Sequence, residues 1–216
     1  MNALLELLFP PKCMLCGSPL GGDEEVCGLC RQRVLLNTAP PLVTAGAFFD
    51  KAAAGLWYEG DVRRAIHGLK YREKQSYARP LAWVMAYAWE HKLGEGCDLI
   101  TYVPTNRSTL RRRGYDQAQL LARELSGLLD IPWTAALEKT RETVPMHGLK
   151  PDARRANVLG AYRLCCSREA VAGRCILLVD DILTTGSTLS ECARTLKTAG
   201  AAQVWGLCAA AAKKTS

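Results

Sequence analysis

Residues 174–189 read RCILLVDDILTTGSTL, and this stretch decides the fold of the chain. Residues 175–179 form a short, uninterrupted apolar run, which is typical of a parallel strand buried on both faces. Asp180 and Asp181 follow directly, at the carboxyl end of the strand, where open α/β sheets bind their ligands. The sequence therefore predicts a strand, a ligand-binding turn and then a helix over residues 188–198.

The turn after the two aspartates has the composition of a phosphate-binding loop. Gly186 lets the backbone approach a ligand closely, and the start of the following helix presents free amides and a positive dipole end to an anion. The stretch has neither the lysine of a Walker P-loop nor the spacing of GxGxxG, which argues against ordinary ATP hydrolysis and dinucleotide binding. The residues expected to hold the phosphate are Thr184, Thr185, Gly186, Ser187 and Thr188.

This stretch resembles the phosphoribosyl pyrophosphate motif of type I phosphoribosyltransferases. The resemblance implies that Asp180 and Asp181 hold the ribose 2′ and 3′ hydroxyls, while the loop holds the 5′-phosphate. Carboxylates suit the first role because they accept hydrogen bonds from hydroxyls. The resemblance also implies the fold class, a type I phosphoribosyltransferase-like parallel sheet flanked by helices.

Two further segments fit the same family. A strand expected over residues 98–103 leads into Pro104-Thr105-Asn106-Arg107, which resembles the loop that binds pyrophosphate. Residues 139–143 and 154–158 bracket what the resemblance makes a flexible loop, which would close over the substrate and exclude water. The ligands of phosphoribosyl pyrophosphate expected from these segments are Thr105, Asn106, Arg107, Lys139 and Arg141.

Two CxxC pairs near the start, Cys13 with Cys16 and Cys27 with Cys30, predict a structural zinc site. Four thiolates close a tetrahedral shell around Zn²⁺ and leave no position for an activated water. The ion would therefore supply folding energy to a segment too short to have its own core. The alternatives are four buried cysteines without a metal, or a redox role for one pair. The other six cysteines are expected to be non-catalytic.

The length of 216 residues allows one α/β domain and a small module. A linker-like stretch over residues 37–41 separates a zinc-binding module, residues 1–38, from a phosphoribosyltransferase-like domain, residues 39–216. Apolar runs are shorter than the roughly 20 residues that span a bilayer. The leucine-rich start lacks a basic segment and carries Glu6, so it does not read as a signal peptide. The chain is therefore expected in the cytoplasm.

Basic residues outnumber acidic ones by 28 to 21, a net charge of +7 that favours anionic partners. After two short, paired strands expected over residues 43–49 and 53–58, a basic amphipathic helix begins at Asp61. Tyr71 and Tyr77 alternate with its cations, as in surfaces that bind single-stranded nucleic acid, although such charges also occur on simple solvated faces. The candidate contacts to nucleic acid are Arg63, Arg64, Lys70, Arg72, Lys74, Arg111, Arg112 and Arg113.

The cysteine module, the stretch RRRGYDQAQLLA at residues 111–122 and the stretch at residues 174–189 are together similar to the ComF family of phosphoribosyltransferase-like proteins. The resemblance covers nearly the whole chain. It implies a role in DNA uptake and competence, with competence helicase and recombination-loading proteins as partners. One departure is Met146, which stands where the family usually has glutamine and removes a polar contact from the flexible loop. The neighbouring His147 is expected to face solvent.

Two classes of function fit these features. The main hypothesis is a protein that handles single-stranded DNA and keeps a pocket for phosphoribosyl pyrophosphate or ribose 5-phosphate groups. The alternative is an active phosphoribosyltransferase on an unidentified acceptor, with Mg²⁺ and the cations Arg107, Arg111, Lys139 and Arg141 stabilising the leaving pyrophosphate. No residue stands out as a base, and the chain leaves no room for a glutaminase domain. A scaffold for other competence proteins is a third class.

Overall fold

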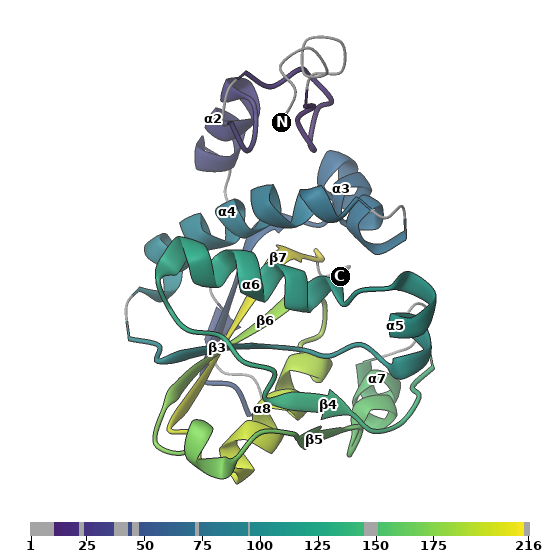
Figure 1. Cartoon of the computed structure of the whole chain (residues 1–216), viewed down its shortest axis with the longest axis vertical. Coiled ribbons are helices and arrows are strands. Elements are labelled where there is room, and N and C mark those ends of the chain that lie inside the picture. The colour runs from purple at the N-terminus through teal and green to yellow at the C-terminus, as the bar shows by residue number, and fades with distance from the viewer. Residues whose placement is uncertain are drawn as a thin grey trace.

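The computed structural model describes residues 11–21, 24–36, 43–44, 48–71, 74–94, 96–144 and 151–213. Its centre is a five-stranded sheet with the order β1-β2-β7-β6-β3 (Figure 1). β1 runs antiparallel to β2, and the other neighbouring pairs are parallel, which confirms the predicted fold class. The strands of this sheet are β1 (Val43–Thr44), β2 (Lys51–Trp57), β3 (Leu99–Tyr102), β6 (Cys175–Leu183) and β7 (Gln203–Ala211).

Helices cover both faces of this sheet (Figure 1). α4 and α6 pack on one face, with α3 next to them, and α8 packs on the other. The α-helices are α2 (Gly28–Leu36), α3 (Gly60–Tyr71), α4 (Ala78–Ala88), α5 (Arg107–Arg113), α6 (Gln117–Leu129), α7 (Pro151–Val158) and α8 (Ser187–Thr198). Shorter helical segments are η1 (Gln75–Tyr77), η2 (Trp89–Leu93) and η3 (Arg168–Ala170).

The continuous apolar run in β6 is explained by this two-sided cover. Leu177 and Val179 are fully buried in the core shared with α4 and α6, whereas Ile176 and Leu178 are fully buried in the core shared with α8. Because successive side chains of a strand point to opposite faces, a strand between two helical layers needs an apolar residue at every position. The predicted strand is confirmed, and it extends beyond residue 179 to Leu183.

A small antiparallel sheet of β4 (Leu137–Lys139) and β5 (Tyr162–Leu164) lies beside α7 and α8 (Figure 1). At the other end of the molecule, α2 and the cysteine-rich loop lie over α4. Arg79 of α4 pairs with Glu25, and the guanidinium of Arg31 lies 5.5 Å from the ring centroid of Trp83. The amino-terminal module therefore packs directly against the helical layer.

Most predicted elements occur with small shifts in their ends. The helix expected from residue 188 is α8 and begins at Ser187. The two paired strands are β1 and β2, within the described residues. The predicted boundary between residues 38 and 39 lies outside the described residues and stays a prediction. Among the described helices, none has the length and apolar character needed to cross a bilayer.

Candidate functional site

The acidic pair projects from the carboxyl-terminal part of β6. Asp180 lies opposite Cys208 of β7 in the strand register, on the face covered by α8. Because side chains alternate along a strand, Asp181 points to the other face, toward α3 and α6. The sequence placed both aspartates after the end of the strand, whereas β6 continues through them to Leu183.

Asp181 forms a buried ion pair that the sequence did not suggest. Its Oδ2 atom lies 2.7 Å from Nζ of Lys70, which stands in the last turn of α3. The side chains of Lys70 and Asp181 are only 19% and 7% exposed. Burial lowers the pKa of Lys70, but the charge and the hydrogen bond of Asp181, together with the charge of Asp180, raise it overall. The prediction that Lys70 contacts DNA is therefore corrected, because its ammonium pairs with the carboxylate of Asp181.

The carboxyl of Asp180 has an unusually high proton affinity. Burial, followed by the charge of Asp181, raises its pKa to about 8, although the charge of Lys70 and the amide of Asp181 act in the opposite direction. The Oδ1 atom of Asp180 accepts a hydrogen bond of 2.8 Å from that amide. A carboxyl with this pKa carries a proton over part of the neutral range, so it can donate as well as accept a hydrogen bond.

The loop between β6 and α8 has the geometry of an anion site. Gly186 is the N-cap of α8 and has a φ of 76°, in the left-handed region that favours glycine. The Oγ atoms of Thr185 and Ser187 lie 2.8 Å apart across it. Thr184 and Thr185 are exposed, Thr188 is half-buried, and Ser187 is buried. The loop therefore brings several hydroxyls to the amino end of a twelve-residue helix.

Asp116, which sequence reasoning missed, fixes the loop that resembles the pyrophosphate loop. Its carboxylate accepts hydrogen bonds from the amide of Thr105, at 2.7 Å, and from the amide of Ala118 in the first turn of α6, at 2.9 Å. Burial raises the pKa of Asp116, and the amides partly offset this. The capping role of Asp116 could have been predicted from the sequence, because an aspartate directly before a predicted helix is a common N-cap. Asn106 caps α5 in the same way, accepting from the amide of Thr109 at 2.7 Å.

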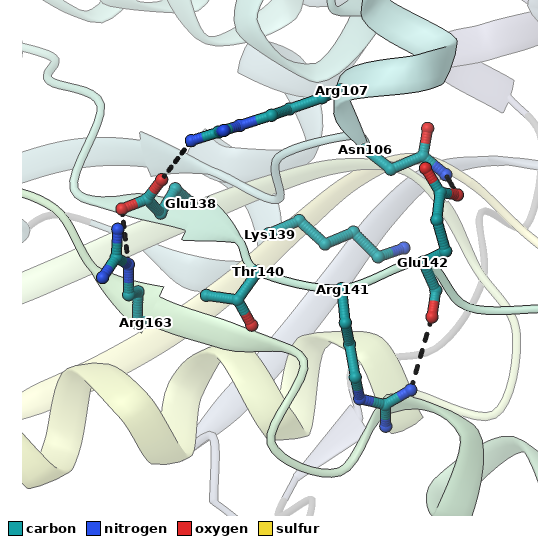
Figure 2. Close-up of a pocket in the computed structure, with 8 residues that line it drawn as sticks. All are labelled: Asn106, Arg107, Glu138, Lys139, Thr140, Arg141, Glu142 and Arg163. Atoms are coloured by element: carbon teal, nitrogen blue, oxygen red, sulfur yellow. Dashed lines mark hydrogen bonds and ion pairs between the residues drawn. The ribbon is translucent and has the colours of Figure 1, made fainter.

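A pocket of about 410 Å³ lies between α5 and the β4–β5 sheet (Figure 2). Arg107 reaches from α5 to Glu138, which also pairs with Arg163 at 2.6 Å. Nζ of Lys139 donates to Oγ1 of Thr143 at 2.8 Å. The pocket therefore brings together four of the predicted ligands with further charged groups. It is lined by Asn106, Arg107, Glu138, Lys139, Thr140, Arg141, Glu142 and Arg163.

Most of the predicted phosphoribosyl ligands thus come from two parts of the fold. The acidic pair and the phosphate loop belong to β6 and α8, whereas the cationic pocket is built by α5 and β4. Lys139 connects them electrostatically. Burial lowers its pKa, and the charges of Cys192, Glu142 and Asp180 oppose this. Met146 and His147 lie outside the described residues, so their predicted roles stay predictions.

The four cysteines of the two CxxC pairs form a compact cluster. Their Sγ atoms all lie within 4.8 Å of one another, and Cys16 and Cys27 are 3.4 Å apart. Hydrogen bonding with Ser18 lowers the pKa of Cys16 to about 6, which favours a thiolate. Zn–S bonds of about 2.3 Å place the sulfurs of a tetrahedral site less than about 4 Å apart, so a small contraction of this four-thiol donor set would hold a structural zinc ion.

The remaining predicted nucleic-acid residues lie on exposed parts of α3, η1 and α5. Arg63, Arg111 and Arg112 are exposed, Arg64 pairs with Asp61, and Arg72 lies outside the described residues. Tyr71 is 62% exposed, with the guanidinium of Arg113 lying 5.4 Å from its ring centroid. A second pocket, of about 300 Å³, joins this surface to the cysteine loop. Its lining includes Lys12, Arg64, Lys74 and Tyr77.

Of the remaining cysteines, Cys192 of α8 and Cys208 of β7 are buried in the core shared with β6, and Cys208 lies opposite Asp180. Cys165 and Cys166 follow directly after β5, which ends at Leu164. Cys97 and Cys175 bring their Sγ atoms within 3.1 Å, at the end of β6 opposite the acidic pair.

Comparisons with known proteins support this description. The phosphoribosyl transferase domain model matches residues 109–216, and the double zinc ribbon domain model matches residues 4–42. The DNA utilization protein YhgH of Escherichia coli O157:H7 is 34% identical over 91% of this chain and 83% of its own length. Competence protein F of Haemophilus influenzae is 33% identical over 91% of this chain and 84% of its own length. Among solved structures, the allosteric regulatory enzyme of purine biosynthesis matches at 18% identity with a TM-score of 0.44, over 67% of this chain and 30% of that one.

Proposed function

Because the chain belongs to the ComF family of phosphoribosyltransferase-like proteins, we propose that it binds phosphoribosyl pyrophosphate or ribose 5-phosphate groups and handles single-stranded DNA in DNA uptake. The observation that carries the proposal is the unit of β6, its loop and α8. On this unit the acidic pair and a hydroxyl-rich helix start occur within a few residues of each other. The names of the relatives support the part that concerns DNA.

The geometry supports binding of a ribose phosphate in the following way. The Asp180 and Asp181 carboxyls would accept hydrogen bonds from the ribose hydroxyls. The 5′-phosphate would lie at the amino end of α8, where Ser187 and Thr188 offer amides and hydroxyls and the helix dipole favours negative charge. The positive φ of Gly186 allows the loop to turn around the phosphate without a side chain in the way.

The diphosphate of phosphoribosyl pyrophosphate would extend toward the cationic pocket, where Arg107, Lys139 and Arg141 can compensate its charge. The residues of the acidic pair do not fit a resident Mg²⁺ ion, because the described structure already places the ammonium of Lys70 against Asp181. Mg²⁺ would arrive with the diphosphate, as part of the substrate. The proposal therefore assigns Mg²⁺ no binding site on the protein.

Single-stranded DNA would lie along the exposed faces of α3 and α5. Arg63, Arg111 and Arg112 would contact phosphates, and the exposed ring of Tyr71 would stack on a base. The pocket that contains Lys12, Lys74 and Tyr77 continues this surface to the cysteine module. The module would then take part in DNA contact as well as in stability.

An active phosphoribosyltransferase remains the alternative, and the 410 Å³ pocket, which gathers the predicted diphosphate ligands Arg107, Lys139 and Arg141, is the observation that favours it. In that reaction the bond from ribose C1 to the pyrophosphate oxygen breaks, and a bond from C1 to the acceptor forms. The two functions share the phosphoribosyl site. Release of pyrophosphate on incubation with nucleobases or single-stranded DNA distinguishes an enzyme from a binding protein.

The proposed function is tested by calorimetric titration with phosphoribosyl pyrophosphate and with a 5′-phosphorylated single-stranded DNA. The variant D180N/D181N should weaken binding of the sugar ligand by at least about tenfold, because it replaces both carboxyl groups, including the charged acceptor Asp181. The variant R63A/R112A should leave binding of the sugar ligand unchanged and weaken binding of DNA. Its DNA affinity should also depend less steeply on salt, because fewer counterions are released. Circular dichroism checks that each variant is folded.

The matched control for the DNA variant is R168A/R174A, which removes two arginines near the other end of β6. It should leave both ligands unaffected. If D180N/D181N folds and binds phosphoribosyl pyrophosphate as the wild type does, the proposed sugar site is wrong. If R63A/R112A and R168A/R174A weaken DNA binding equally, the exposed face of α3 and α5 has no specific role in DNA binding.

A further inference from the structure

The placement of Lys70 is determined by the end of α3. Lys70 lies in the last turn of this helix, and the hydroxyl of the buried Tyr115 donates a hydrogen bond to the carbonyl oxygen of Leu69, next to it. Gly68 and Leu69 are buried as well. This anchoring directs the Lys70 side chain to Asp181, away from the exposed face that carries Arg63 and Arg64.

Asp181 and the two carboxyl groups that interact with it electrostatically, Asp116 and Asp180, differ in how they are compensated. Asp116 accepts hydrogen bonds from the amides of Thr105, Ala118 and Gln119. Asp180 accepts one from the amide of Asp181. Asp181 instead has the ammonium of Lys70 at 2.7 Å. Without that ammonium, Asp181 would be a buried carboxylate next to two other acidic groups, an arrangement that requires a cation or a proton.

We propose that Lys70 is a positioning residue of the ribose site, whose ammonium takes the place at Asp181 that a divalent cation would otherwise fill. The inference rests on the proposed function, because it concerns the same acidic pair. The ion pair uses Oδ2 of Asp181, so Oδ1 is left to accept from a sugar hydroxyl. Sugar binding at the acidic pair is then independent of Mg²⁺, and K70M creates a need for Mg²⁺ that the wild type lacks.

The first experiment uses Mg²⁺ alone and needs no sugar ligand. The melting temperatures of the wild type, K70M and the control K213M are measured with and without millimolar MgCl₂. Lys213 is a suitable control because it also pairs with a carboxylate, Glu59 at 2.8 Å, but on the exposed surface. K70M should be stabilised by Mg²⁺, and the wild type and K213M should not. The double variant K70M/D181N should lose the response, because it removes the carboxylate that would bind the ion.

The second experiment tests the wild type directly, so it stands even where K70M does not fold. The affinity for ribose 5-phosphate is measured by calorimetry in EDTA and in MgCl₂. The two affinities of the wild type should agree within about twofold. K70M should bind ribose 5-phosphate at least about tenfold more weakly in EDTA than in MgCl₂. Equal responses of the wild type and K70M to Mg²⁺ alone, or wild-type affinity that rises tenfold with Mg²⁺, would overturn the role of Lys70. Absence of ribose 5-phosphate binding by the wild type contradicts the proposed function instead, and the Mg²⁺ experiment still decides the role of Lys70.

Discussion

At the scale of single residues, the proton on Asp180 has a measurable consequence for stability. Burial and the charge of Asp181 raise the pKa of Asp180 to about 8, whereas an unfolded chain ionises this carboxyl near pH 4. Between these values the folded state binds more protons than the unfolded state, so the free energy of unfolding falls as the pH rises from about 4 to about 8. Burial also raises the pKa of Asp116, so this residue adds a further decrease in the free energy of unfolding with rising pH.

The variant D180N should therefore show a shallower loss of stability with rising pH than the wild type, because an amide does not titrate. The measurement is urea unfolding at pH 5.5, 7.0 and 8.5. D61N is the control, since it removes a carboxyl from the surface of α3 instead. Parallel pH curves for D180N and the wild type would show that Asp180 is ionised in the folded state across this range.

The site residues that could be predicted from the sequence differ in a physical way from those that could not. The Asp180–Asp181 pair and the threonines after it are readable because strand, ligand turn and helix start follow one another in the chain. The partnership of Lys70 with Asp181 joins α3 to β6 across the fold, and no local pattern indicates it. Asp116 lies between these cases, because its capping of α6 is local while its bond to Thr105 is not.

At the scale of elements, the turn into α8 requires both a left-handed backbone and a missing side chain at Gly186. Gly186 has a φ of 76°, and a Cβ atom there would lie 3.3 Å from Cε1 of Phe49. G186V should therefore lose stability by about 1–2 kcal/mol from backbone strain alone, and more from the contact with Phe49. It should also lose affinity for phosphoribosyl pyrophosphate, because the shifted loop no longer presents its amides to the phosphate.

The matched variant is G173V, which has a φ of 72° and no atom within 4 Å of the added Cβ. It should show the strain in urea unfolding but bind phosphoribosyl pyrophosphate normally. Wild-type affinity in G186V would mean that the phosphate does not approach this loop.

Element types were predictable from periodicity, while their partners were not. The apolar run of β6 and the amphipathic pattern of α3 indicate a strand and a helix correctly. The sheet order β1-β2-β7-β6-β3 pairs strands that are far apart in the chain, so it follows from packing and from the family rather than from any local signal. For the same reason, the division of the predicted ligands between the β6–α8 unit and the β4–α5 pocket became visible only in the structure.

At the scale of the whole molecule, the cysteine module and the helical layer form one core. Cys13, Cys27, Cys30 and Val34 belong to the same buried cluster as residues of α3 and α4. Structural zinc contributes roughly 10 kcal/mol or more of apparent folding free energy in small modules. Loss of zinc should therefore unfold the module and uncover the outer side of α4, whereas the sheet keeps its two helical layers.

The variant C27S should consequently lose stoichiometric zinc and expose residues 11–36 and the packed side of α4, around Trp83, to fast hydrogen exchange. Strands β6 and β7 should stay protected, because their core lies between α4, α6 and α8. The control C165S replaces an exposed cysteine outside the cluster and should keep both zinc and protection. Elemental analysis and hydrogen exchange read by mass spectrometry measure these effects. Wild-type protein without zinc would refute the metal site, and C27S protein in which β6 exchanges as fast as the module would show that the fold of the sheet depends on the module.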